Sequence, residues 1–153
     1  MKLKNIFPVV LCILIGFFMG NFMFKEYNQN TQTVSLTGEK LYFLQAGVFS
    51  SEEEMKREMS KFSYYIYTKE NNMYYSYVGI VKKEKNLKKL KEFYKSEGYD
   101  IYVREIFISN ISFITILNQY ETLLEETSDN KIIKSIESQI LSKYEELVMI
   151  DKN

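Results

Sequence analysis

Few side chains of this 153-residue chain could perform catalysis. It contains no histidine, and its single cysteine, Cys12, lies in an apolar N-terminal segment. Without histidine, the usual catalytic triads and dyads and all imidazole metal sites are missing. The carboxylates occur in helix-cap and surface contexts, with no histidine, cysteine or metal-ligand cluster beside them. We therefore expect no enzyme activity, no metal and no cofactor.

Side chains that could recognise a ligand occur instead in two short apolar runs. LYFLQAGVFSSEEEM at 41–55 and MYYSYVGIVKKEKNL at 73–87 form an internal repeat with an offset of 32 residues, which pairs Gly47 with Gly79. The chain has 13 tyrosines and 11 phenylalanines. An AT-rich coding sequence explains this abundance as well as a functional role does. The repeat itself is the more specific signal, because it places similar side chains at equivalent positions of two strands.

These positions define a candidate binding platform. Strand alternation directs Phe43 and Gln45 to one side of the first run, and Tyr75 and Tyr77 to one side of the second. Tyr102 extends the surface at its edge. Aromatic rings can contact the C–H faces of sugars, and a glutamine both donates and accepts hydrogen bonds. Two alternatives stay open: an inverted sheet would make these residues core, and the C-terminal segment could cover them.

The elements that would position this platform alternate between strand and helix. In the first half, Ser50 and Ser51 precede Glu53 and Glu54 by three residues, which is the spacing of a helix-starting capping box. A second short strand is predicted over 64–67. In the second half we expect Asn86 to cap a helix, Gly98 to end it and a last strand to follow over 99–104.

The predicted order is therefore βαββαβ, and the fold class is α+β. Such an order folds most simply as a four-stranded antiparallel sheet in the split βαβ, or ferredoxin-like, arrangement. The two repeat strands are then central. Both helices cover one face of the sheet, and the other face is open.

Residues 107–153 follow the repeat and read as a helical hairpin with its turn at Thr127–Asn130. We expect the hairpin to pack on the domain or on itself, the alternative being a dedicated partner site, and we expect a fragment ending near Ile108 to fold without it. The apolar positions of the two helices are spaced by three and four residues: Ile114, Leu117, Tyr120, Leu124, Ile133, Ile136, Ile140, Tyr144 and Leu147.

The N-terminus predicts a membrane anchor. Residues 6–24 carry no charge, and a helix of that length spans about 28 Å, close to the thickness of a bilayer core. Lys2 and Lys4 precede it, so we place 1–5 in the cytoplasm, 6–24 across the membrane and 25–153 outside the cytoplasm, with 25–39 as a linker. A cleaved signal peptide is the rival interpretation, but no small-residue cleavage pattern follows the apolar run.

Residues 82–95 contain seven lysines and two glutamates. Such a run is usually a solvated helix face. The alternative is contact with anionic lipid or with an anionic wall polymer.

The first strand and its turn, residues 42–50 (YFLQAGVFS), followed by acidic residues and a helix, resemble the SPOR (sporulation-related repeat) family. The resemblance covers 40–106. It implies a tandem βαβ domain on a single membrane anchor that binds peptidoglycan glycan strands lacking stem peptides, often at division or sporulation septa. By motif position, Phe43, Gln45, Tyr75 and Tyr77 would line the glycan-binding face. The family usually has an arginine on the strand before the second-repeat glycine, and this chain has none there.

Two functions follow as hypotheses. The first is noncatalytic binding of peptidoglycan at the cell envelope, in cell division or sporulation. The alternative is a structural interaction protein that recruits another membrane or wall protein through its hairpin. An RNA-recognition fold has the same strand order, but an outward-facing domain without a basic motif on its third strand does not favour nucleic acid.

Overall fold

The computed structural model describes residues 38–149, which belong to one compact unit. The predicted cytoplasmic segment 1–5 and membrane helix 6–24 lie outside the described residues, as does most of the predicted linker 25–39. Within residues 38–149, no helix is both long and apolar enough to cross a bilayer.

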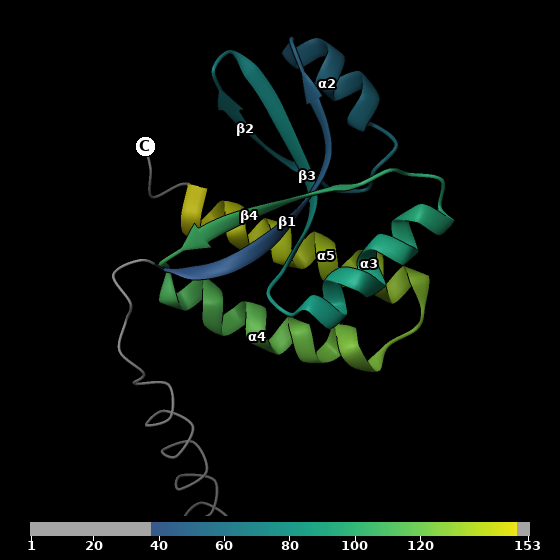
Figure 1. Ribbon diagram of the computed structural model, residues 1–153, viewed down its shortest axis with the longest axis vertical. Coiled ribbons are helices and arrows are strands. Elements are labelled where there is room, and N and C mark those ends of the chain that lie inside the picture. The colour runs from purple at the N-terminus through teal and green to yellow at the C-terminus, as the bar shows by residue number, and fades with distance from the viewer. Residues whose placement is uncertain (1–37, 150–153) are drawn as a thin grey trace, which may run out of the picture. The chain divides into compact units, whose positions relative to one another are not determined.

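A four-stranded antiparallel sheet with the order β2-β3-β1-β4 forms the centre of the fold (Figure 1). Its strands are β1 (Glu39–Phe49), β2 (Ile66–Glu70), β3 (Met73–Val81) and β4 (Tyr102–Ile108). The two repeat strands, β1 and β3, are central and pair with each other. The prediction of an α+β chain with a four-stranded antiparallel sheet is confirmed.

Helix α2 (Glu52–Met59) begins as its capping sequence predicts. The Ser51 hydroxyl accepts a hydrogen bond from the backbone N–H of Glu54 at 3.2 Å. Three glutamates in the first turn lie near the positive end of the helix dipole. Met55 and Met59 are buried and hold the helix against the sheet.

Helix α3 (Glu84–Ser96) begins at a different residue from the one predicted. Its N-cap is Lys83, whose side chain makes no capping hydrogen bond. Asn86 is instead buried in the first turn, where its amide donates to the backbone carbonyl and the carboxylate of Glu121 at 2.9 and 2.7 Å. Asn86 therefore attaches α3 to the C-terminal hairpin, which local sequence could not reveal.

The end of α3 follows the prediction, whereas the next strand begins later than predicted. Gly98 has φ +86°, and the N–H groups of Gly98 and Tyr99 donate to the carbonyls of Lys95 and Tyr94 at 3.0 and 2.9 Å. This pairing is the Schellman arrangement, which needs a residue of positive φ after the helix. Since Tyr99 completes the closing turn, β4 begins only at Tyr102.

Strands β2 and β3 are joined by Asn71 and Asn72, whose φ values are +51° and +61°. Two consecutive positive φ angles are what a two-residue type I′ hairpin requires, and asparagine tolerates them better than most residues. Pairing continues to the turn, where Glu70 faces Met73. The second strand therefore occupies 66–70 instead of the predicted 64–67.

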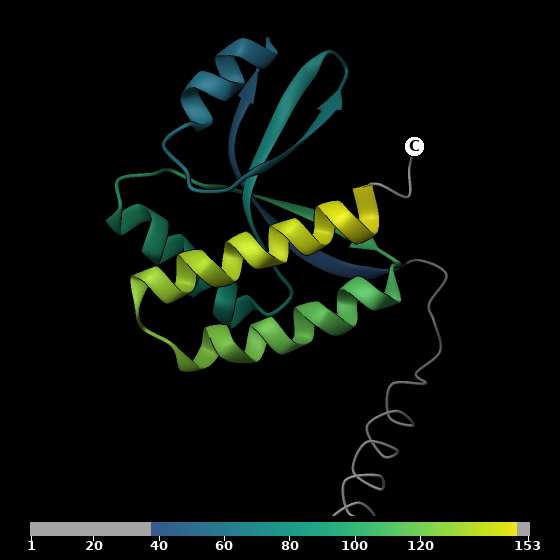
Figure 2. The same ribbon diagram turned by 180° about the vertical axis from the view of Figure 1, so that it is seen from behind.

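Residues after β4 form the predicted helical hairpin, made of α4 (Ile111–Glu126) and α5 (Asn130–Tyr144). A π-helical turn (Glu145–Met149) extends α5. The Asn110 and Asp129 side chains cap the two helices by accepting backbone hydrogen bonds. Figure 2 shows the two helices side by side, with α5 crossing the strands.

The hairpin packs on the domain and shares its core. Its buried side chains belong to the same hydrophobic cluster as those of β1 and β3. Phe113, Leu117 and Ile140 have no exposed surface. Because apolar burial contributes roughly 25 cal/mol per Å², we expect the hairpin and the sheet to stabilise each other.

Two buried carboxylates of the hairpin complete the hydrogen bonding of β3. Because β2 pairs with only the first part of β3, the far end of that strand has a free edge toward the hairpin. There the Ile80 N–H donates to Glu137 at 3.2 Å, and the Lys82 and Lys83 N–H groups donate to Glu121 at 2.5 and 3.3 Å. Glu121 and Glu137 thus stand where a neighbouring strand would otherwise supply carbonyl groups.

Candidate functional site

Predicted site residues form a row across one face of the sheet. On β1, Gln45 pairs with Tyr77 on β3 and with Tyr102 on β4. Residues directly opposite each other in an antiparallel pair project to the same face, so the glutamine has a tyrosine on either side. Tyr75 stands two residues before Tyr77 and projects to this face as well.

Arg104, on β4, extends over this face and connects its tyrosines. Its guanidinium lies 4.8 Å from the centroid of the Tyr75 ring, which is a cation–π contact. It donates a hydrogen bond to the Tyr77 hydroxyl at 2.8 Å and forms a salt bridge with Glu70 on β2 at 3.0 Å. These contacts link the two edge strands over the central ones.

Arg104 is cationic and still accessible. The hydrogen bond to the Glu70 carboxylate raises the pKa of Arg104 above its ordinary value. The Arg104 and Glu70 side chains are 37% and 45% exposed. An ion pair of this exposure contributes at most about 1 kcal/mol, so an incoming ligand could compete for either partner at little cost.

The five predicted site residues differ sharply in exposure. Tyr102 is 70% exposed, whereas Gln45 and Tyr75 are partly buried. Phe43 and Tyr77 are each only 1% exposed. The expectation that all of them line an open face is therefore wrong for Phe43 and Tyr77, and the accessible part of the row consists of Gln45, Tyr75 and Tyr102.

The hairpin is what covers Phe43. The Tyr144 ring of α5 lies 5.2 Å from the Phe43 ring, and Phe43 lies 5.4 Å from the Tyr77 ring, both in edge-to-face geometry. Phe113 of α4 adds a further edge-to-face contact with Tyr144 at 5.2 Å. Burial raises the pKa of the Tyr144 hydroxyl to about 12, so the ring stays neutral. The face is closed near the hairpin and accessible only at its far end.

Sequence reasoning missed Arg104 as a site residue, although one signal was present. Arg104 stands two residues after Tyr102, so the same alternation that selected the tyrosines places the arginine on their side. It reaches the tyrosines of β3 from β4.

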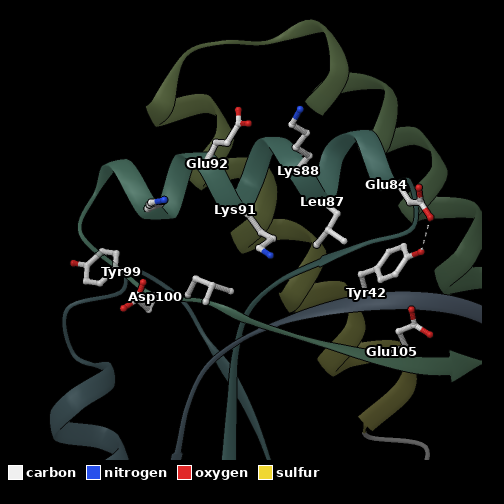
Figure 3. A pocket seen from close by; sticks show the side chains of 11 residues that line it. Tyr42, Glu84, Leu87, Lys88, Lys91, Glu92, Tyr99, Asp100 and Glu105 are labelled. Atoms are coloured by element: carbon white, nitrogen blue, oxygen red, sulfur yellow. Dashed lines mark hydrogen bonds between the residues drawn. The ribbon is translucent and has the colours of Figure 1, made fainter.

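A second concave surface lies between α3 and β4 (Figure 3). The groove has a volume of about 610 Å³, and the Tyr42 hydroxyl donates to Glu84 at one end at 3.3 Å. In Figure 3, Leu87 and Lys91 point from α3 toward the strand, whereas Lys88 and Glu92 point away from it. The sequence did not predict this groove.

The lysines of 82–95 divide into two groups. The first group pairs with other elements: Lys82, which precedes α3, pairs with Glu39 of β1, while Lys83 and Lys85 pair with Glu125 of α4. The side chain of Lys89 donates to backbone carbonyls at the end of α4. Among the described residues, no ion pair forms at the three lysines of the groove, Lys88, Lys91 and Lys95.

Within the described part of the chain, no group of three or more potential metal ligands occurs. Comparisons with protein-family models, with curated proteins and with solved structures find no match for this chain. The resemblance to the SPOR family therefore stays a prediction carried by residues 40–106.

Proposed function

We propose that this chain is a noncatalytic protein of the cell envelope that binds glycan strands of peptidoglycan. The proposal includes a ferredoxin-like arrangement of the sheet, a membrane anchor at 6–24 and a domain that lies outside the cytoplasm. Its context, by resemblance, is cell division or sporulation. The observation that supports it best is the accessible surface formed by Gln45, Tyr75, Tyr102 and Arg104.

This surface has the chemistry that a glycan strand needs. The Tyr102 ring is free to contact the C–H face of a sugar, and the Gln45 amide beside it can exchange hydrogen bonds with hydroxyl or acetamido groups. The Arg104 guanidinium offers further donors. Its stacking on Tyr75 and its bond to Tyr77 hold those donors in a fixed orientation, which lowers the entropic cost of binding.

A noncatalytic role is supported by the contacts of the carboxylates near this face. Glu70 is paired with Arg104, and the buried Glu121 and Glu137 accept backbone N–H groups. Most glycoside hydrolases use two carboxyl groups that flank the bond they cleave. Among residues 38–149, Glu70 is the carboxylate that hydrogen-bonds to Arg104.

A sedimentation assay with purified sacculi enriched in stem-peptide-free glycan tests the proposal. We expect Gln45→Ala, Tyr75→Ala and Tyr102→Ala each to weaken binding by roughly fivefold or more, which corresponds to about 1 kcal/mol. Phe107→Ala is the matched control, because Phe107 is similarly exposed (61%) on the same strand but stands beyond the row. Unchanged binding in all three variants would refute the site.

One feature favours the alternative of a protein-recruiting hairpin. Leu123 on α4 and Ile132 on α5 are about half exposed and border a groove of about 520 Å³ at the turn of the hairpin. A chain in which both are replaced by serine should keep binding sacculi if the glycan proposal holds. If the wild type fails to bind sacculi, and the same replacement abolishes cross-linking to a membrane protein, the hairpin function is the better account.

A further inference from the structure

We propose that the groove between α3 and β4 binds an extended peptide segment of a partner protein, which adds to β4 as a fifth strand. This site is separate from the face that carries Arg104, so the inference goes beyond the proposed glycan binding. The partner segment has apolar side chains at alternate positions and an acidic side chain that pairs with Lys91.

The first observation is that β4 is an edge strand. In the sheet order it pairs with β1 alone, along seven residues from Tyr102 to Ile108. Within residues 38–149, no backbone hydrogen bond reaches these residues from an element other than β1. Edge strands of this kind present a row of free N–H and C=O groups to which another chain can pair.

The second observation is that β4 has few of the features that usually block such pairing. It contains no proline or lysine, and the register of its pairing with β1 is regular throughout. Its Phe107 side chain, which by strand alternation projects to the face opposite Tyr102 and Arg104, is 61% exposed. An exposed apolar residue on such an edge is consistent with a surface that a partner covers when it binds.

The third observation is the groove itself, which runs beside this strand. Tyr42, Leu87, Tyr99 and Ile101 provide its apolar surface, and its volume is about 610 Å³. Every second side chain of an added strand projects to the same side, so alternate residues of a bound peptide would enter the groove. A helix beside a strand edge is a recurrent geometry for peptide recognition, in which the backbone provides affinity and the side-chain pockets provide specificity.

Charge defines the kind of peptide. Lys91 points from α3 into the space between helix and strand (Figure 3), and it forms no ion pair within the described residues. The groove has four carboxylates. Glu84 accepts from Tyr42 and Glu105 is paired with Lys40. Glu92 points away from the strand, and Asp100 lies beside Tyr99 at the end of the groove opposite Glu84 (Figure 3). An acidic side chain of the peptide would pair with Lys91, which a bound peptide would otherwise partly desolvate without providing a partner.

The test uses the full chain in detergent and synthetic fluorescent decapeptides. One peptide alternates valine with threonine and carries one central aspartate on the valine side, and a second carries lysine at that position. We expect the aspartate peptide to bind at least about tenfold more tightly, by fluorescence anisotropy. With Lys91→Glu the preference should reverse, whereas the control Lys131→Glu, an exposed lysine of α5, should leave it unchanged.

Strand addition has its own signature. N-methylation of alternate peptide residues blocks one edge of the peptide, so one of the two N-methylated series should lose binding and the other should keep it. Bound peptide should also slow hydrogen exchange of the amides of residues 102–108. Equal binding of both N-methylated series would overturn the proposal. The proposal would also be overturned if peptide left the hydrogen exchange of the β4 amides unchanged, or if these amides were already protected without peptide. Binding of polyphosphate through the lysines with no change in β4 would identify an anionic-polymer site instead.

Discussion

The backbone N–H of Ile80 donates to the carboxylate of Glu137, 57 residues later in the chain, at 3.2 Å. Glu137 is 2% exposed, and its second carboxylate oxygen has no hydrogen-bond partner among the described residues. A glutamate of α5 thus accepts the hydrogen bond that a neighbouring strand would otherwise accept from β3. The contact between α5 and β3 thus includes a hydrogen bond to an ionisable group, and this group makes the stability of the fold depend on pH.

Burial is the main cause that raises the pKa of Glu137 well above its ordinary value of 4.5, and the Glu121 carboxylate raises it further, against the lowering effect of the Ile80 N–H. Tyr94 of α3, which is also buried, faces the same carboxyl. The native state therefore keeps a proton on Glu137 at pH values where the unfolded chain has lost it. Because the native state binds more protons over that range, the free energy of unfolding falls as pH rises from about 4.5 toward the native pKa.

Glu137→Gln should reduce this dependence, since the amide is neutral at every pH. Between pH 5 and pH 8, the unfolding free energy of the variant should rise relative to that of the wild type. The difference should grow by about 1.4 kcal/mol for each pH unit that lies below the native pKa of Glu137. Urea unfolding at the two pH values measures the effect. Glu126→Gln, at an exposed carboxyl of α4, is the control and should not change the slope. Equal slopes in Glu137→Gln and the wild type would show that Glu137 is ionised in the native state.

Gly79→Ala should destabilise the fold through the same contact. A Cβ at this position would lie 2.5 Å from the Glu137 carboxylate, which is far inside van der Waals contact. We expect a loss of about 1–3 kcal/mol. Shortening the acid in Glu137→Ala relieves the clash, so the double variant should lose less than the sum of the two single losses in a thermal-unfolding cycle. Additive losses would mean that the backbone of β3 moves away from α5 without cost.

Removal of the hairpin should unfold the sheet. A chain that ends at Ile108 lacks Tyr144, Phe113 and the two carboxylates that accept N–H groups of β3, which leaves Phe43 uncovered. We expect it to lose the cooperative thermal transition in circular dichroism. A chain that ends at Met149 should retain the transition and serves as the control. A cooperative transition in the shorter chain would show that the sheet folds without the hairpin.

Phe43→Ala and Tyr102→Ala should separate core from surface among the predicted site residues. Phe43 is buried between two rings, and its removal should cost about 3–5 kcal/mol of unfolding free energy. Tyr102 is 70% exposed, so the same change should cost less than about 0.5 kcal/mol. Urea denaturation compares them directly. Similar losses in both variants would mean that Tyr102 is also packed in solution.

Local signals predicted much of this fold. The serine cap at Ser51 and the glycine stop at Gly98 act through hydrogen bonds within a few residues, so the sequence there contains all the partners. The sheet order followed from the repeat. The positions of Asn86 and Phe43 could not be predicted in the same way, because their partners belong to α4 and α5.

The sequence contains a signal for the two buried acids, Glu121 and Glu137. Glu121 is four residues after Leu117 and three before Leu124, and Glu137 is four after Ile133 and three before Ile140, so both stand in the apolar stripes of their helices. A charged residue in such a stripe indicates a specific buried partner. Which backbone it meets depends on where β2 ceases to pair with β3, and the sequence has no local signal for that.

Phe43 and Tyr75 occupy equivalent positions of the two repeats. Tyr144 covers Phe43, whereas Arg104 contacts Tyr75. A tandem repeat with pseudo-twofold symmetry would accept a linear polymer equally well in either direction, since each half offers the same groups to opposite ends. In this fold the hairpin covers the first repeat at Phe43, and Arg104 adds hydrogen-bond donors beside Tyr75 of the second. A glycan strand bound at this face would therefore be held with a single polarity, its reducing and non-reducing ends distinguished by the fold.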